Sequence, residues 1–104
     1  MPNFAVTVVH GSGWDASRGI REQDGWDEHA AFMDTLTDEG FVVLGGPLGT
    51  GRVLLCVAAA DERDVRARLA ADPWEPAGLL IVASVEPWAL WLDSRRPQAD
   101  APQR

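Results

Sequence analysis

Two strand–helix–strand units follow one another along the chain, and this order constrains the fold more than any other feature. Four apolar runs rich in β-branched residues are expected to be strands, at residues 3–10, 41–45, 52–59 and 79–85, with 88–92 expected to resume the last one. Two stretches with helical periodicity separate these runs, at residues 26–39 and 61–71. The chain therefore has the order β-α-β, β-α-β.

Both expected helices carry recognisable end signals. Asp24, with Asp27 three residues further on, is expected to cap the first helix, and Gly40 to follow its last turn. Asp61 is expected to cap the second helix, and Pro73 to stop it. These signals support the helix assignments.

This order of elements predicts an α+β fold. With right-handed crossovers, two such units form a four-stranded antiparallel sheet with both helices on one face, the ferredoxin-like split βαβ (βαββαβ) plan. The 104 residues are the length of one domain. We expect that domain to span residues 1–93, and residues 94–104 to form a flexible C-terminal tail.

The expected strands are apolar on both of their faces. In the first strand both alternating sets of side chains are apolar or β-branched, and residues 79–82 are apolar at every position. A sheet that helices cover on one face alone normally alternates apolar and polar residues. A second copy packed sheet to sheet would cover the other face. The sequence therefore predicts a homodimer.

Charge excludes several classes of partner. The formal net charge is −7, and all nine basic residues are Arg. Residues 1–93 hold six Arg against fifteen acidic residues, so this surface repels nucleic-acid phosphates and anionic membranes. No apolar run reaches the ~20 residues of a membrane span, and the first residues lack the basic start of a signal peptide. We expect a cytoplasmic protein with neither nucleic acid nor membrane as a partner.

Two polar residues on apolar helix stripes are the candidate catalytic pair. His29 precedes the stripe of Phe32, Met33 and Leu36, and Asp72 ends the stripe of the second helix. In the split βαβ plan the helices run antiparallel, so the start of the first meets the end of the second. His29 and Asp72, far apart in sequence, are therefore predicted to be neighbours.

The chemistry of such a pair is proton transfer. A carboxylate hydrogen-bonded to one imidazole nitrogen fixes the tautomer and makes the other nitrogen a stronger base. Asp72 at a helix C-terminus also opposes the helix dipole, a local conflict of the kind that gathers at functional sites. The alternatives are that His29 is a hydrogen-bonded core residue and that Asp72 only starts a turn before Pro73.

Further candidate ligand-binding residues fall at the same edge of the sheet. Three Trp side chains suit a planar ligand or, alternatively, seal the core; the loop at residues 11–24 offers groups for an anion or is simply solvated. His10 ends the first strand and is either a second polar wall or a strand terminus. These candidate substrate-binding residues are Trp14, Trp26, Trp74, Arg18, Arg21, Gln23 and His10.

No metal site and no cofactor is implied. Two His and a lone Cys give no spacing typical of structural zinc. Cys56 falls within an apolar strand and is expected to be a buried small side chain. The glycines at residues 45–51 lack the ending of a phosphate-binding loop.

Several short motifs in order resemble the YCII-related (YciI-like) family. They include His29 early in a helix, Glu39-Gly40 before a strand, Gly46-Pro47-Leu48 at a hairpin, Ala71-Asp72-Pro73 after the second helix, and Glu86-Pro87-Trp88. The resemblance spans most of residues 3–92. The chain differs from the family in a longer loop at 11–24, richer in Arg and Trp, and in Trp74 where Tyr or Phe is usual.

The resemblance implies a dimeric α+β barrel with a His–Asp pair as the active site, which transfers to His29 and Asp72. Most members of the family have no assigned reaction. Some related proteins are dehydrochlorinases of chlorinated or hydroxylated aromatics, and others with the same barrel are isomerases or cofactor-free monooxygenases.

Three functions stay open on the sequence. The first is a small enzyme of His/Asp acid–base chemistry (elimination, isomerisation or hydrolysis) on a small, possibly aromatic, anionic substrate. The second is a ligand-binding module on the same fold. The third is a pairing subunit with a collapsed pocket, which would leave no open cavity beside His29.

Overall fold

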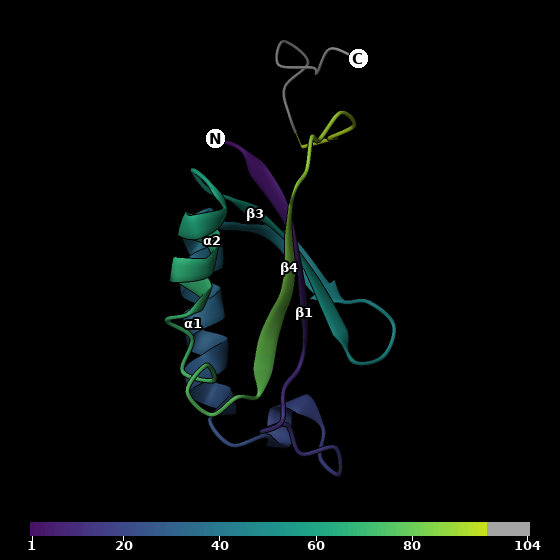
Figure 1. Ribbon diagram of the computed structural model, residues 1–104, viewed down its shortest axis with the longest axis vertical. Helices are drawn as coiled ribbons and strands as arrows, with labels where there is room; N and C mark the ends of the chain where they lie inside the picture. The colour runs from purple at the N-terminus through teal and green to yellow at the C-terminus, as the bar shows by residue number, and fades with distance from the viewer. Residues whose placement is uncertain (96–104) are drawn as a thin grey trace.

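The structure, a computed structural model, describes residues 1–95 and contains one four-stranded sheet with two helices (Figure 1). Residue 96 onward, most of the expected tail, lies outside the described residues. The elements in chain order are β1 (Asn3–His10), the short 3-10 helix η1 (Ile20–Glu22), α1 (Trp26–Asp38), β2 (Val42–Pro47), β3 (Arg52–Ala58), α2 (Glu62–Leu69) and β4 (Leu80–Pro87).

The sheet has the strand order β2-β3-β1-β4, and every neighbouring pair is antiparallel. Figure 1 shows both helices on the same side of this sheet. The predicted α+β fold with a four-stranded antiparallel sheet and helices on one face is confirmed. No helix within residues 1–95 is long and apolar enough to cross a membrane.

Several predicted element ends were wrong by one to a few residues. Asp24 does not cap α1: the N-cap is Gly25, whose φ of 80° lies in the left-handed region that glycine adopts most readily. The helix α2 ends at Leu69 rather than near residue 71, so Asp72 lies in the turn that follows. Residues 88–92 do not resume the strand, although the Trp88 N–H still donates to the Asn3 carbonyl at 2.9 Å.

Other end signals are confirmed. The Asp61 side chain accepts the Asp64 backbone N–H at 2.8 Å, as an N-cap does. Gly40 follows α1 with φ 82°, and its N–H donates to the Thr37 carbonyl.

The hydrophobic core lies between the helices and one face of the sheet. Cross-strand partners point to the same face, so Val6 of β1 shares this face with Leu55 of β3 and Val85 of β4. All three are buried, together with Leu36 of α1 and Val65 of α2. Burial of apolar side chains at about 25 cal/mol per Å² holds the two layers together.

No element of residues 1–95 covers the opposite face of the sheet in the way the helices cover the first (Figure 1). On this face Thr7 of β1 pairs with Leu54 of β3, and both are half-buried, while Ile81 of β4 is 51% exposed. Cys56 is an exception at 1% exposed. One copy of the chain therefore leaves apolar surface exposed on this face.

The two helices run antiparallel, and side chains join them at both ends. Arg68 of α2 forms an ion pair with Glu39, just after the last residue of α1. Asp72 contacts His29 in the first turns of α1. Because Asp72, just after the end of α2, meets His29 near the start of α1, the start of α1 and the end of α2 lie at one edge of the sheet.

Candidate active site

His29 and Asp72 are hydrogen-bonded across 43 positions of sequence. The Nδ1 atom of His29 lies 2.9 Å from Oδ1 and 2.8 Å from Oδ2 of Asp72. His29 is 8% exposed and belongs to the first turns of α1, where its backbone N–H donates to the Gly25 carbonyl. The predicted proximity of the two residues is confirmed.

Local structure after α2 holds the carboxylate of Asp72 in place. The Asp72 backbone N–H donates to the Leu69 carbonyl at 3.1 Å and closes a turn. Oδ1 of Asp72 also accepts the backbone N–H of Trp74 at 2.9 Å, which forms an Asx turn across Pro73. The Asp72 carboxylate therefore contacts Nδ1 of His29 in α1 and accepts the Trp74 backbone N–H in the turn, and these two contacts fix its orientation.

The hydrogen bond to Asp72 determines the tautomer of His29. A carboxylate accepts hydrogen bonds and has none to donate, so Nδ1 carries the proton and donates it. In the neutral ring Nε2 then has the free lone pair. Nε2 has no hydrogen-bond partner, and within the described residues no fully buried polar side-chain atom lacks one. Nε2 is therefore open to solvent or to a ligand.

Trp74 fixes the plane of the His29 ring. The two rings stack with centroids 3.9 Å apart and an interplanar angle of 6°. Trp74 is 2% exposed, and its Nε1–H donates to the Asp24 carbonyl at 2.8 Å. Trp26 approaches the imidazole from another direction, with a centroid distance of 6.0 Å. The imidazole therefore has little freedom to rotate.

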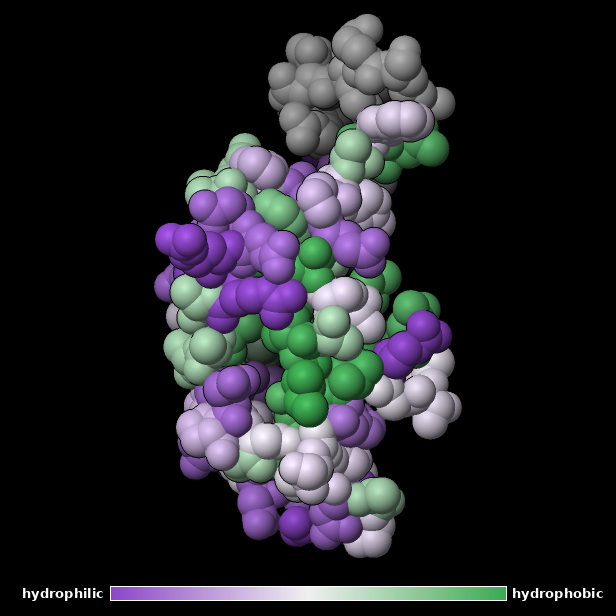
Figure 2. Space-filling model, viewed as in Figure 1, coloured by the Kyte–Doolittle hydropathy of each residue, from purple (hydrophilic) through white to green (hydrophobic). Residues whose placement is uncertain are grey.

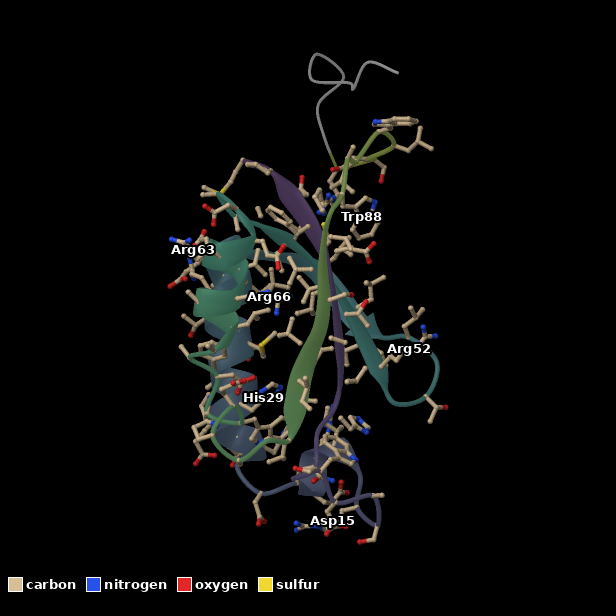
Figure 3. All side chains as sticks on the ribbon, viewed as in Figure 1. Asp15, His29, Arg52, Arg63, Arg66 and Trp88 are labelled. Carbon is tan, nitrogen blue, oxygen red and sulfur yellow. The ribbon has the colours of Figure 1, made fainter. Side chains whose placement is uncertain are left out.

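A cavity of about 570 Å³ opens beside this pair. Figure 3 shows the His29 side chain between the helix layer and the sheet, and in Figure 2 apolar side chains gather along β4 beside the polar helix layer. The wall is mostly apolar, which is typical of sites for small organic molecules. Its lining residues are Val8, His10, Trp14, Ile20, Trp26, His29, Met33, Thr37, Val42, Leu44, Gly45, Gly46, Pro47, Val53, Leu55, Leu69, Asp72, Glu75, Leu80 and Val82.

Some of the candidate residues line this cavity and others do not. His10, Trp14 and Trp26 belong to its wall. Trp74 lies behind His29 and supports it, and is not among the lining residues. The other lining residues, which include Ile20 and Glu75, were not named as site residues from the sequence. Glu75 follows Trp74 in a turn that the topology places at this edge of the sheet. Its position in the sequence could therefore have identified it as a residue of the site.

The polar residues of the loop at 11–24 bind to the loop itself. The Gln23 amide accepts the Asp15 N–H at 3.0 Å and donates to the carbonyls of Asp15 and Arg18 at 2.8 and 3.1 Å. The Arg18 guanidinium pairs with Asp15 and Asp24. Arg21 is exposed. The structure brings none of Arg18, Arg21 and Gln23 to the cavity wall.

Close backbone contacts dock the loop on the turn before β4. The N–H groups of Gly11 and Gly13 donate to the carbonyls of Leu79 and Gly78 at 2.8 and 3.0 Å. A Cβ on Gly13 would lie 2.0 Å from the Ala77 carbonyl oxygen, so only glycine permits this approach. The docked loop holds Trp14 at the cavity.

Asp15 organises the outer part of the same loop (Figure 3). Its carboxylate accepts the Ser17 hydroxyl at 2.6 Å and the Ser17 N–H at 2.9 Å. These two hydrogen bonds, with a smaller contribution from Arg18, hold the pKa of Asp15 below its ordinary value of 3.8. The carboxylate is therefore committed to the loop fold.

Among solved structures, the fold is similar to that of 5-chloro-2-hydroxyhydroquinone dehydrochlorinase (TftG) from Burkholderia phenoliruptrix AC1100, in complex with 2,5-dihydroxybenzoquinone. The two chains are 23% identical, with a TM-score of 0.60 over 83% of this chain and 93% of that chain. This likeness shows a shared fold. No family model and no curated protein sequence matches the chain.

Proposed function

We propose that the protein is a small enzyme in which His29 moves a proton on a small organic substrate bound in the 570 Å³ cavity. One observation carries the proposal: Asp72 holds Nδ1 of His29 at 2.8 Å while Nε2 stays unpartnered beside an apolar cavity. In this arrangement Nε2 takes up a proton from the substrate. Asp72 keeps the ring oriented and stabilises the imidazolium that forms.

Hydroxylated aromatic rings are the proposed substrate class. The cavity is lined by Trp rings and aliphatic side chains, which suit a planar ligand. The structurally similar dehydrochlorinase acts on a chlorinated hydroxyhydroquinone. Loss of hydrogen chloride starts from the keto form of such a ring, in which the chlorine-bearing carbon also carries a hydrogen. A base then takes a hydroxyl proton, a new C=O bond forms, and chloride leaves with the electron pair of the carbon–chlorine bond. His29 is positioned for that step, and isomerisation would use the same proton transfer.

The proposal does not include the anionic group that Arg18 and Arg21 were expected to hold. Neither residue lines the cavity, whereas the carboxylates of Asp72 and Glu75 do. An uncharged hydroxyl-bearing ring fits these surroundings better than a carboxylate-bearing one, because like charges repel. The collapsed pocket that a pure pairing subunit would have is not found, since His29 lines an open cavity.

We also propose that the chain belongs to the YciI-like family and works in the cytoplasm as a homodimer. The half-exposed apolar face of the sheet, with Ile81 at 51% exposure, supports the dimer. A monomer mass in analytical ultracentrifugation at micromolar concentration would contradict it.

The experiment that tests the catalytic proposal compares the wild type with His29→Gln on chlorinated and unchlorinated hydroxyhydroquinones. Turnover should fall by about 10²–10⁴-fold, the usual contribution of a general base. Affinity for an unreactive dihydroxybenzene should change by less than about threefold. If the substitution weakens binding and leaves the rate of bound substrate unchanged, His29 only binds ligand and the protein is a binding module.

A further inference from the structure

We propose that His10 is the second polar contact to the substrate and hydrogen-bonds a ring hydroxyl remote from the one that faces His29. This inference rests on the proposed function, because it assigns a role within the same cavity. It concerns recognition of the substrate and not proton transfer, so the experiment that tests it is separate from the test of His29.

The position of His10 is fixed while its polar atoms stay free. His10 is the last residue of β1 and lines the cavity. Its ring stacks on Trp14 with centroids 3.7 Å apart and an interplanar angle of 10°. Stacking occupies the face of an imidazole and leaves both nitrogens at the ring edge. Within the described residues neither nitrogen has a hydrogen-bond or ion-pair partner.

Few other side chains of the wall have polar atoms to offer a ligand. Thr37 donates its hydroxyl to the Met33 carbonyl at 2.9 Å. Asp72 is committed to His29 and to the Trp74 N–H. Among the described lining side chains, the groups left are Nε2 of His29, the two nitrogens of His10, the indole N–H groups of Trp14 and Trp26, and the Glu75 carboxylate. His10 and Glu75 are both exposed. The indole N–H groups only donate and the carboxylate only accepts, whereas the ring edge of His10 offers two nitrogens to a hydroxyl group. His10 is therefore the strongest candidate for a second hydrogen bond.

The two imidazoles are linked through two indole rings. Trp14 meets Trp74 edge to face, with centroids 6.0 Å apart at 89°, and Trp74 stacks on His29. His10 in turn stacks on Trp14. Two Trp rings separate the imidazoles in this chain of contacts, and both imidazoles line the same cavity. The proposal therefore assigns them to different parts of the bound ligand. A substrate with hydroxyl groups at two separate ring positions satisfies both.

The pair of probes that isolates this contact is hydroquinone and phenol, which differ by one hydroxyl. Dissociation constants are measured by NMR titration of the full chain. The wild type should bind hydroquinone about five- to tenfold more tightly than phenol, the range expected for one added hydrogen bond. About twofold of any preference is statistical, because hydroquinone has two equivalent hydroxyls.

The decisive variant is His10→Phe, because phenylalanine retains an aromatic ring for stacking on Trp14 and removes both nitrogens. Its preference for hydroquinone should fall to about twofold, with affinity for phenol unchanged. His10→Gln should keep part of the preference, since its amide can still hydrogen-bond. Arg63→Gln is the matched control, because Arg63 projects from α2 away from the cavity (Figure 3), and it should behave as wild type.

Two results would overturn the assignment: an unchanged preference in His10→Phe, or no hydroquinone binding by the wild type at millimolar concentration. Failure of the catalytic proposal looks different. In that case the preference depends on His10 as expected, but His29→Gln turns over every substrate at the wild-type rate.

Discussion

His29 and Trp74 stack face to face, 3.9 Å apart and within 6° of parallel, and Asp72 is bonded to both residues. The Asp72 carboxylate accepts hydrogen bonds from Nδ1–H of His29 and from the backbone N–H of Trp74. The carboxylate therefore fixes the direction of the Nδ1 edge of the imidazole, and the Trp74 indole fixes the plane of the ring. The unit Asp72-Pro73-Trp74 thus supplies both restraints on the candidate base. A residue on a helix is positioned by three consecutive residues of a turn.

Substitution of Asp72 by Asn should allow both tautomers of the His29 imidazole in the folded protein. An amide oxygen can still accept the Trp74 N–H, so the turn is retained, but the amide can also donate to Nδ1 and stabilise the wrong tautomer. In ¹⁵N–¹H NMR spectra of the imidazole, the wild type should show the Nδ1–H form and Asp72→Asn a mixture. The catalytic rate should fall by about 10²-fold or more. The same tautomer and rate in both proteins would contradict a role for Asp72 in orienting the base.

Replacement of Trp74 separates its two contributions. Trp74→Phe keeps a ring against His29 and loses the Nε1–H bond to Asp24, so the free energy of unfolding should fall by about 1 kcal/mol or somewhat more. Trp74→Ala should cost about 3–5 kcal/mol, because it also leaves a cavity. Chemical denaturation measures both. Trp91→Ala, at a side chain that is 55% exposed, is the control and should stay within about 0.5 kcal/mol of wild type.

The docked loop should not tolerate a side chain at Gly13. Because a Cβ would lie 2.0 Å from the Ala77 carbonyl oxygen, Gly13→Ala must move one backbone segment away from the other. We expect a loss of about 1–3 kcal/mol in the free energy of unfolding and weaker ligand binding, since Trp14 moves with the loop. Gly46→Ala has nothing within 4 Å of the added Cβ and serves as the comparison. Equal stability of the two variants would show that the docking is not required.

The buried thiol of Cys56 should make stability fall at alkaline pH. Burial, which dominates, and the nearby Asp93 charge raise the pKa of the thiol above its ordinary value of 9.0, while Arg95 opposes them. The unfolded chain ionises first, so this contribution to stability is complete below pH 9.0 and is lost as the pH rises through the folded value. Urea denaturation from pH about 8 to about 10 should show the decline in the wild type and a shallower one in Cys56→Ala. Identical slopes would contradict the burial argument.

The candidate pair illustrates how far the sequence can be interpreted. The apolar stripe places His29 on the inner face near the start of α1, and the β-α-β order implies antiparallel helices, so the meeting of His29 with Asp72 could be predicted. The way in which Asp72 reaches His29 could not be predicted. The helix α2 ends at Leu69, and Asp72 contacts His29 from a turn whose geometry depends on the Trp74 N–H.

The loop at 11–24 shows the opposite case. Its Arg and Gln residues were interpreted from the sequence as ligand-binding groups. A loop has no helical or strand periodicity, so the sequence pattern does not indicate which way these side chains point. In the folded protein Gln23 is 3% exposed and binds loop carbonyls, while Arg18 pairs with acidic residues of the same loop. Polar groups in a compact loop satisfy one another first, because a buried unpaired group is costly.

Local patterns alone therefore determined the order of strands and helices, the caps at Asp61 and Gly40, and the side of α1 that carries His29, because each depends on residues within a few positions of one another. Only the tertiary structure decided which polar groups face the cavity, that Trp74 supports the imidazole from behind, and that His10 keeps its nitrogens free. Those outcomes depend on contacts between segments tens of residues apart, where side-chain packing and hydrogen-bond competition determine the orientation of each group.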